Sequence, residues 1–365
     1  MEKKERKSNF EILRILAMVL IISYHFVFHS NYNYGAINAH DFILRTFWLF
    51  GEIGVNLFML ISGYFMVHSK FSLKKVIRLV LEVNFYYIIG VILSNHFSDA
   101  DKIDFNTTKK IFLNGFPVLN NVYWFTGAYI LVYIFSPYIN TMIKGLSQKD
   151  YQKLLMIVLV IWSIVPTILG YYTEGAENAL FFSRMIWLIV VYLIGGYIRI
   201  YNIKFLDRKR NASLGAIISF GVELLLMFIL WRKNSEEVNP IYFWGPNSVM
   251  QIALSISIFM IFKNINVKSN VIINKIASTT LGVYLLHEGP IENVWSKVFN
   301  YHDTMSLPLG SALLDIFRFV LIIFSLGICI DLIRQLLEKF IVNPILDKLF
   351  ELNNKKKQGI IFLAF

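Results

Sequence analysis

Two ionisable residues, Arg14 and His25, lie eleven positions apart in an apolar stretch near the start of the chain. At about 100° per residue, eleven positions make about three helical turns, so both side chains share one face, roughly 16 Å apart along the axis. Arginine binds phosphate or carboxylate through its planar fork, and neutral histidine is a suitable general base. The alternative is that Arg14 belongs to a basic belt at a membrane surface and that His25 is a hydrogen-bonded packing residue.

A second apolar stretch carries further polar candidates. Glu52 and Asn56 are four residues apart, so they share a helix face and either one is placed to orient His25 or to bind a substrate. An interhelical hydrogen bond is the simpler alternative for both. Ser62 is a candidate nucleophile, although Gly63 beside it favours a packing role.

Other apolar stretches of the chain also contain charged residues. Glu82 most simply neutralises Arg78, four residues before it, and Asp315 and Arg318 are expected to form a local pair. Glu223 is a functional candidate because a carboxylate inside a membrane is costly. The other histidines are expected in loops or at interfaces: His29, His40, His68, His96 and His302.

The composition excludes several classes of protein. Of the 365 residues, 56% are hydrophobic and 16% are charged, against about 45–50% and about 25% in ordinary soluble domains. A disordered chain, a disulfide scaffold and a typical cytosolic enzyme are therefore excluded. Cys329 is the single cysteine, and we expect no metal site. The net charge of +11 does not indicate a nucleic-acid partner in so apolar a chain. We expect instead that the basic residues lie mostly on one side of a membrane.

The predicted fold is an all-α polytopic membrane protein, a single transmembrane domain over residues 1–365. A spanning helix needs about 20 mostly apolar residues. Asn274, Lys275 and Ser278 dilute the first half of the ninth candidate, which makes it the weakest. Ten stretches qualify: 12–29, 48–67, 76–95, 122–142, 152–171, 181–200, 212–231, 244–262, 270–287 and 311–332.

The basic residues predict the orientation of this bundle. With ten spans, the connecting segments alternate between basic and poorly basic, and most of the 35 Lys and Arg residues fall on one side. Removing the ninth span would place the basic C-terminal segment outside, against the positive-inside rule. We therefore expect both termini to be cytoplasmic and the protein to be a multi-pass protein of the plasma membrane.

Five motifs follow one another along the chain. The Arg14 and His25 pair precedes a second-helix motif, and a basic edge and an aromatic motif come next. The last motif is Tyr284-Leu-Leu-His287, near the end of the ninth span. In order, the three intervening motifs comprise Gly54, Val55, Phe58, Ser62, Gly63 and Tyr64; Lys74, Lys75 and Arg78; and Tyr123, Trp124 and Phe125. Together they resemble the acyltransferase-3 family of integral-membrane acyltransferases.

The resemblance implies a reaction. Family members transfer an acyl group, commonly acetyl from acetyl-CoA, to hydroxyls of cell-envelope carbohydrates. It thus implies acetyl-CoA or another acyl-CoA as co-substrate, no tightly bound cofactor, and an envelope polysaccharide or lipid-linked glycan as acceptor. His25 is then the general base or a transient acyl carrier. The donor phosphates need cations, for which Arg14, Lys74, Lys75 and Arg78 are the candidates at the cytoplasmic edge.

Acceptor-side roles follow from the same resemblance. Trp124 and His287 match family motifs and are candidates to bind or orient the acceptor, together with Glu52, Asn56 and Ser62. For His287, beside Glu288, the alternative is a cap at the membrane interface.

Two other functions fit a ten-helix bundle with buried charges. One is a secondary transporter or flippase for an envelope glycolipid, although the chain lacks the paired, broken halves that many transporters show. The other is a sensor or scaffold without catalysis, which leaves the buried ionisable residues unexplained.

Overall fold

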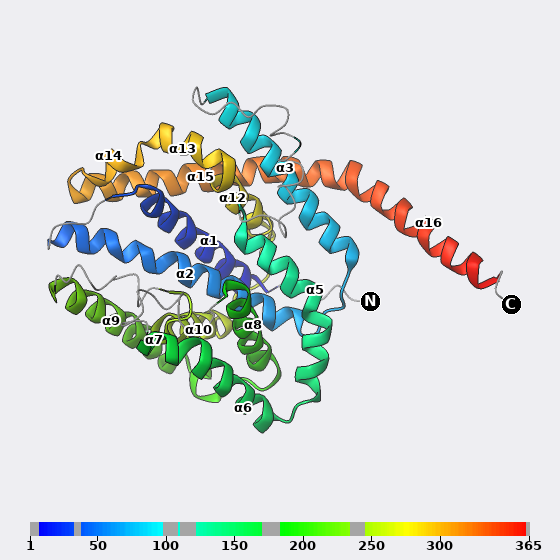
Figure 1. Ribbon diagram of the computed structural model, residues 1–365, viewed down its shortest axis with the longest axis horizontal. Helices are drawn as coiled ribbons and strands as arrows, with labels where there is room; N and C mark the ends of the chain where they lie inside the picture. The colour runs from blue at the N-terminus through cyan, green and yellow to red at the C-terminus, as the bar shows by residue number, and fades with distance from the viewer. Residues whose placement is uncertain are drawn as a thin grey trace.

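The computed structural model describes residues 7–32, 38–97, 109, 122–169, 183–233 and 245–362, which form a bundle of helices (Figure 1). None of these residues belongs to a β-strand. The helices are α1 (Ser8–His29), α2 (Ala39–Met66), α3 (Leu73–Phe97), α5 (Trp124–Gly145), α6 (Gln148–Leu159), η1 (Val160–Ile164), α7 (Val165–Leu169), α8 (Arg184–Ile200), η4 (Lys204–Asp207), α9 (Lys209–Lys233), α10 (Val249–Lys263), α11 (Val271–Ala277), α12 (Thr280–His287), η6 (Gly289–Ile291), α13 (Glu292–Phe299), α14 (Tyr301–Met305), α15 (Leu309–Leu337), η7 (Glu338–Val342) and α16 (Asn343–Phe362).

Helices α1 and α2 form the centre of the bundle. They pack along each other, and α2 also packs against α8 and α10, while α1 contacts α11, α12 and α15 (Figure 1). Among the candidate membrane helices, α2 is the most deeply buried. Most residues of α2 therefore face other helices rather than lipid.

Side-chain caps fix where three of the helices begin. Asn38 accepts a hydrogen bond from the backbone N–H of Asp41 before α2, and Ser147 accepts one from Asp150 before α6. The Asn270 side chain accepts two, from Ile272 and Ile273, before α11. Each cap satisfies N–H groups that have no partner within the helix.

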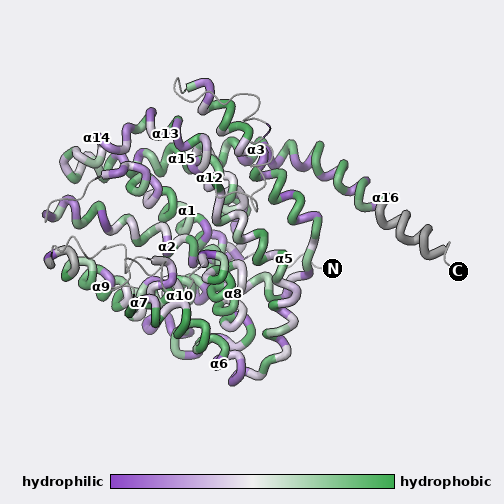
Figure 2. Tube along the Cα trace, in the orientation of Figure 1, coloured by the Kyte–Doolittle hydropathy of each residue, from purple (hydrophilic) through white to green (hydrophobic). Residues whose placement is uncertain are grey.

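Six helical segments are long and apolar enough to cross a membrane, and the described residues also include two shorter apolar helical segments. The described residues of the ten predicted spans lie mostly on helices, but the count of ten and the position of the termini stay predictions. Hydrophobic residues follow most of these helices along their length (Figure 2). Many large apolar side chains are exposed on the bundle surface, as contact with lipid requires. The chain is a multi-pass membrane protein.

Two of the predicted spans are interrupted. The ninth is two short helices, α11 and α12, because Ser278 and Thr279 form a turn between them. The fifth contains the π-helical turn η1 just before Pro166, whose missing N–H prevents a regular hydrogen-bond pattern. The polar residues that weakened the ninth span therefore mark a helix break.

Two glycines of the second-helix motif allow neighbouring helices to approach α2 closely. A Cβ on Gly54 would lie 2.5 Å from the Ile21 side chain and 2.7 Å from the Ala17 carbonyl oxygen of α1. A Cβ on Gly63 would overlap the backbone of Tyr192 on α8. The motif thus sets the spacing between α1, α2 and α8, which is the role of small residues at membrane helix contacts.

Replacing Gly63 by alanine should therefore destabilise the bundle. We expect Gly63→Ala to lower the free energy of unfolding by roughly 1–3 kcal/mol, because the new methyl group meets backbone atoms that cannot rotate away. Gly221→Ala on α9 is the matched control, since a Cβ there meets nothing within 4 Å. Thermal unfolding in detergent measures both variants; equal midpoints would contradict the close contact.

Candidate active site

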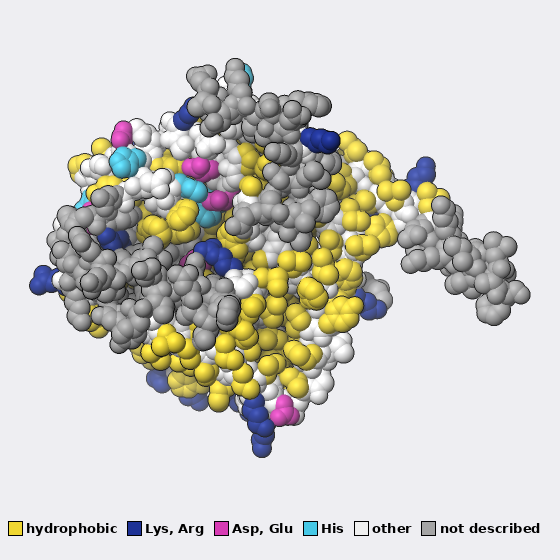
Figure 3. Space-filling model, in the orientation of Figure 1, with side chains coloured by type: hydrophobic (Ala, Val, Ile, Leu, Met, Phe, Trp, Pro, Cys, Tyr) yellow, Lys and Arg dark blue, Asp and Glu magenta, His cyan; other side chains and the backbone are white. Residues whose placement is uncertain are grey.

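A cavity of about 610 Å³ follows the polar face of α1. Arg14 and His25 both line it, so the face predicted from their spacing points toward the bundle interior. Glu52 and Ser62 of α2 and Trp124 of α5 line the same cavity. On the molecular face shown in Figure 3, histidine and acidic side chains gather in one area that borders a broad hydrophobic surface.

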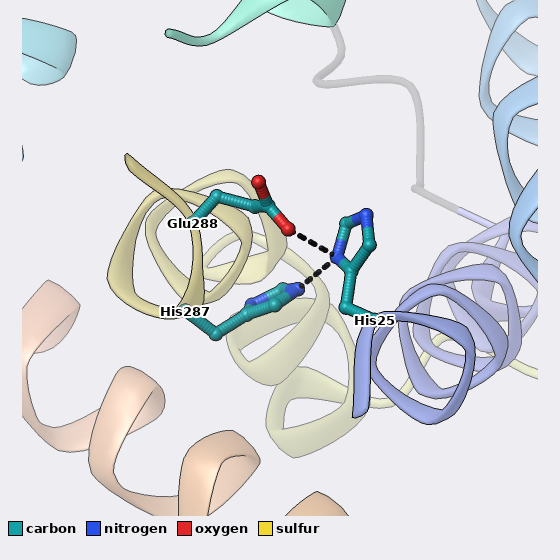
Figure 4. Close-up of side chains that lie close together, drawn as sticks. All are labelled: His25, His287 and Glu288. Atoms are coloured by element: carbon teal, nitrogen blue, oxygen red, sulfur yellow. Dashed lines mark hydrogen bonds and ion pairs between the residues drawn. The ribbon is translucent and has the colours of Figure 1, made fainter. Parts of the chain in front are cut away.

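His25 lies at the centre of a cluster with His287 and Glu288, here called the His25 cluster (Figure 4). Its Nδ1 is 2.9 Å from Nε2 of His287 and 2.9 Å from Oε1 of Glu288. The side chains are largely buried, at 14% exposure for His25 and 16% for Glu288. The packing of α1 against α12 thus brings His25 to His287 and Glu288, which are 262 and 263 positions away in the sequence.

The hydrogen-bond partners of each imidazole nitrogen indicate which nitrogen atoms of this cluster carry a proton. Nδ1 of His287 is 2.7 Å from the carbonyl oxygen of Val283, which can only accept, so that nitrogen carries the proton. The Nε2 of neutral His287 is then an acceptor, and so is the Glu288 carboxylate. Nδ1 of His25 must donate to them, which leaves Nε2 of His25 with its lone pair available as a base.

Two further residues extend the cluster. His29, one turn after His25, lies 3.0 Å from Glu288 through Nε2 and 3.8 Å from Glu292 through Nδ1. Burial alone would raise the pKa of the Glu288 carboxyl, but interactions with His25 and His29 outweigh it and hold that pKa well below its usual range. Burial raises the pKa of Glu292. Glu288 is therefore the ionised acceptor of the cluster.

Arg14 is held by a neighbouring acid. Its Nη1 lies 2.8 Å from the buried carboxylate of Glu11, three residues earlier on α1. Its side chain is 25% exposed and still lines the cavity. Arg14 is thus oriented by Glu11 and can direct its remaining N–H groups at an anion.

The other cations of the proposed donor site lie elsewhere. Lys74 is paired with Asp347, and Nε of Arg78 is 3.4 Å from Glu338, while Lys75 is exposed. None of the three lines this cavity, so they do not converge with Arg14 there.

The expected pairing of Glu82 with Arg78 is wrong. Glu82 lies 3.2 Å from Arg334 of α15, whose guanidinium also binds Asp331 at 2.6 Å. Long-range packing overrides the local spacing because α15 brings Arg334, which is more buried than Arg78, to Glu82. The expected pair of Asp315 and Arg318 is confirmed, at 2.8 Å.

The acceptor-side candidates separate into two groups. Glu52, Ser62 and Trp124 line the cavity, and His287 completes the His25 cluster. Asn56 does not line the cavity. It is fully buried, accepting from the Trp187 indole at 2.9 Å and donating to the Pro246 carbonyl at 2.9 Å. The Ser62 hydroxyl donates to the Phe58 carbonyl at 2.8 Å, which fits a packing role.

Two residues of this site were not expected there from the sequence. His29 is not an isolated interface residue, and its spacing of four from His25 is one that metal-binding histidines use. The expectation of no metal site overlooked that spacing. Arg184 also lines the cavity, with its guanidinium 4.6 Å from the ring centre of Trp124. Glu223 is buried but does not line this cavity.

The comparison with known families identifies the class of protein. A family model described as an acyltransferase domain, that of the acyltransferase-3 family, matches residues 7–334. The match covers both helices of the His25 cluster and the whole cavity. The chain therefore belongs to the acyltransferase-3 family of membrane acyltransferases. No curated protein and no solved structure matches it.

The proton assignment can be tested directly. In protein labelled with ¹⁵N at histidine, we expect His287 to carry its proton on Nδ1 and neutral His25 to have an unprotonated Nε2, because Val283 and Glu288 are acceptors. NMR spectra of His25→Ala and His287→Gln would assign the two signals. A proton on Nε2 of His287 would contradict the assignment.

Proposed function

We propose that this protein moves an acyl group, most simply acetyl, from cytosolic acyl-CoA to a hydroxyl of a cell-envelope carbohydrate in the plasma membrane. The observation that carries the proposal is that a base-competent His25 and a cation, Arg14, line one cavity. The family establishes acyl transfer; the donor, the acceptor and the residue roles are our inference.

His25 acts as the general base in this mechanism. Its Nε2 takes the proton of the acceptor hydroxyl while that oxygen attacks the thioester carbonyl carbon. The tetrahedral intermediate then collapses, the carbon–sulfur bond breaks, and the imidazolium returns the proton to the leaving thiolate. The products are the ester and coenzyme A.

Glu288 and His287 position this base. Both accept from the Nδ1 proton of His25, so they fix its tautomer and ring orientation, and the ionised Glu288 stabilises the imidazolium that forms. They act through His25 and need not touch the substrate.

Arg14 is the donor-side residue that the cavity supports. It lies roughly 16 Å from His25 along α1, a separation that suits an extended pantetheine arm between the phosphates and the thioester. Trp124 offers an aromatic face, and Glu52 an acceptor for carbohydrate hydroxyls, in the same cavity. In this proposal Lys74, Lys75 and Arg78 are charges at the membrane edge and do not bind the donor.

Removing the base should abolish transfer. We expect His25→Ala to lower the rate about 10²–10⁴-fold and Glu288→Gln to lower kcat with little change in KM, because only the transition state gains the charge. The exposed His96→Ala is the control. The measurements are initial rates of transfer in membranes and the O-acetyl signal, by NMR, of envelope glycans from a deletion strain carrying each variant at equal protein level. Wild-type signal with His25→Ala would refute the assignment of His25 as the base, and wild-type signal in the deletion strain itself would favour transport without catalysis.

The donor site has its own test. We expect replacing both Arg14 and Glu11 by glutamine, which keeps the local charge balance, to raise KM for acyl-CoA about tenfold or more, since a charged hydrogen bond contributes about 1.5–3 kcal/mol. Arg78→Gln should leave KM nearly unchanged. Initial rates in membranes at varied donor concentration measure both. A larger effect at Arg78 would move the donor site to the membrane edge.

A further inference from the structure

We propose that the His25 cluster also binds one divalent transition-metal ion of the zinc class, and that the bound ion inhibits acyl transfer. Nδ1 of His25, Nε2 of His287 and a carboxylate oxygen of Glu288 all lie within 4.8 Å of one another. Binding follows from this geometry alone, whereas inhibition rests on the proposed function of His25.

The ligand atoms are close to the spacing that zinc needs. Zinc binds histidine nitrogen at about 2.0–2.1 Å and carboxylate oxygen at about 2.0–2.2 Å in a tetrahedron, which separates the ligand atoms by roughly 3.4 Å. His25 Nδ1 is 2.9 Å from each of its two partners. Small rotations of the side chains would open these contacts enough to admit an ion in place of the shared proton.

The surroundings already orient the ligands. His287 donates from Nδ1 to the Val283 carbonyl at 2.7 Å, so its Nε2 lone pair is directed at the cluster. Metal-bound histidines almost always use their second nitrogen in this way. His29 likewise contacts the Glu288 carboxylate at 3.0 Å. A ligand set of two imidazoles and one carboxylate favours zinc over magnesium or calcium, which prefer oxygen ligands.

The cavity provides access and a fourth ligand position. His25 and Glu288 both line it, while His287 is 1% exposed and does not line it. A water molecule from the cavity can therefore complete the tetrahedron without any rearrangement of the helices.

Coordination would remove the base. Neutral His25 carries its proton on Nδ1 in the hydrogen-bonded cluster. An ion bound at Nδ1 displaces that proton, and the neutral ring then carries it on Nε2, the atom that must accept the proton of the acceptor hydroxyl. Metal and substrate proton thus compete for one imidazole, which makes the bound form inactive.

Binding is tested on purified, tag-free protein in detergent by titration with zinc against a chromophoric chelator. We expect one zinc ion per chain, with affinity at least 10-fold lower in the His287→Gln/Glu288→Gln double variant and unchanged in the control His96→Gln. Magnesium should not compete. X-ray absorption of the wild-type complex should show two imidazoles and one carboxylate, which needs no variant to fold. Absence of binding, or equal binding by the double variant, would overturn the proposal.

Inhibition is then measured in the transfer assay. Zinc should lower the rate at the concentrations that fill the site, and EDTA should restore it. An unchanged or higher rate with the site filled would overturn the inhibitory role. A preparation that binds zinc but transfers no acyl group with any donor would refute the proposed function and leave the metal site standing.

Discussion

The hydrogen bond from Nδ1 of His25 to two acceptors is the interaction on which the site depends. A buried carboxylate is costly unless it is paired, and a buried imidazole has two tautomers that differ in which nitrogen is basic. Placing Glu288 and His287 on the same nitrogen resolves both problems, because the acid gains a donor and the ring keeps its other nitrogen unprotonated. The arrangement requires α1 and α12 to meet at a fixed height along the bundle, so the geometry of the cluster depends on helix packing.

Helix packing is set by small residues and by breaks. Gly54 and Gly63 bring α1 and α8 close to α2, so the cavity is bounded by rigid contacts. The turn at Ser278 and Thr279 separates α11 from α12, and the last residue of α12, His287, contacts His25 of α1.

Sequence periodicity was sufficient for features that depend on one helix. The shared face of Arg14 and His25 follows from 3.6 residues per turn, and the helical spans follow from hydropathy. Periodicity could not predict contacts between residues that are distant in the sequence. Glu82 was assigned to its neighbour Arg78 because local spacing was the only geometry available, whereas α15 supplies the actual partner, Arg334. Asn56 is likewise explained only by Trp187 and Pro246, which tertiary packing brings to it.

Helices α15, η7 and α16 run as one long rod whose far end projects from the bundle (Figure 1). Glu338 and Asp347 on this rod neutralise Arg78 and Lys74 of α3, and both acids lie beyond the residues that match the family model. Because such partly exposed pairs are screened by salt, rising ionic strength should loosen the outer attachment of the rod to α3, while the buried contact of Glu82 with Arg334 continues to join the two helices.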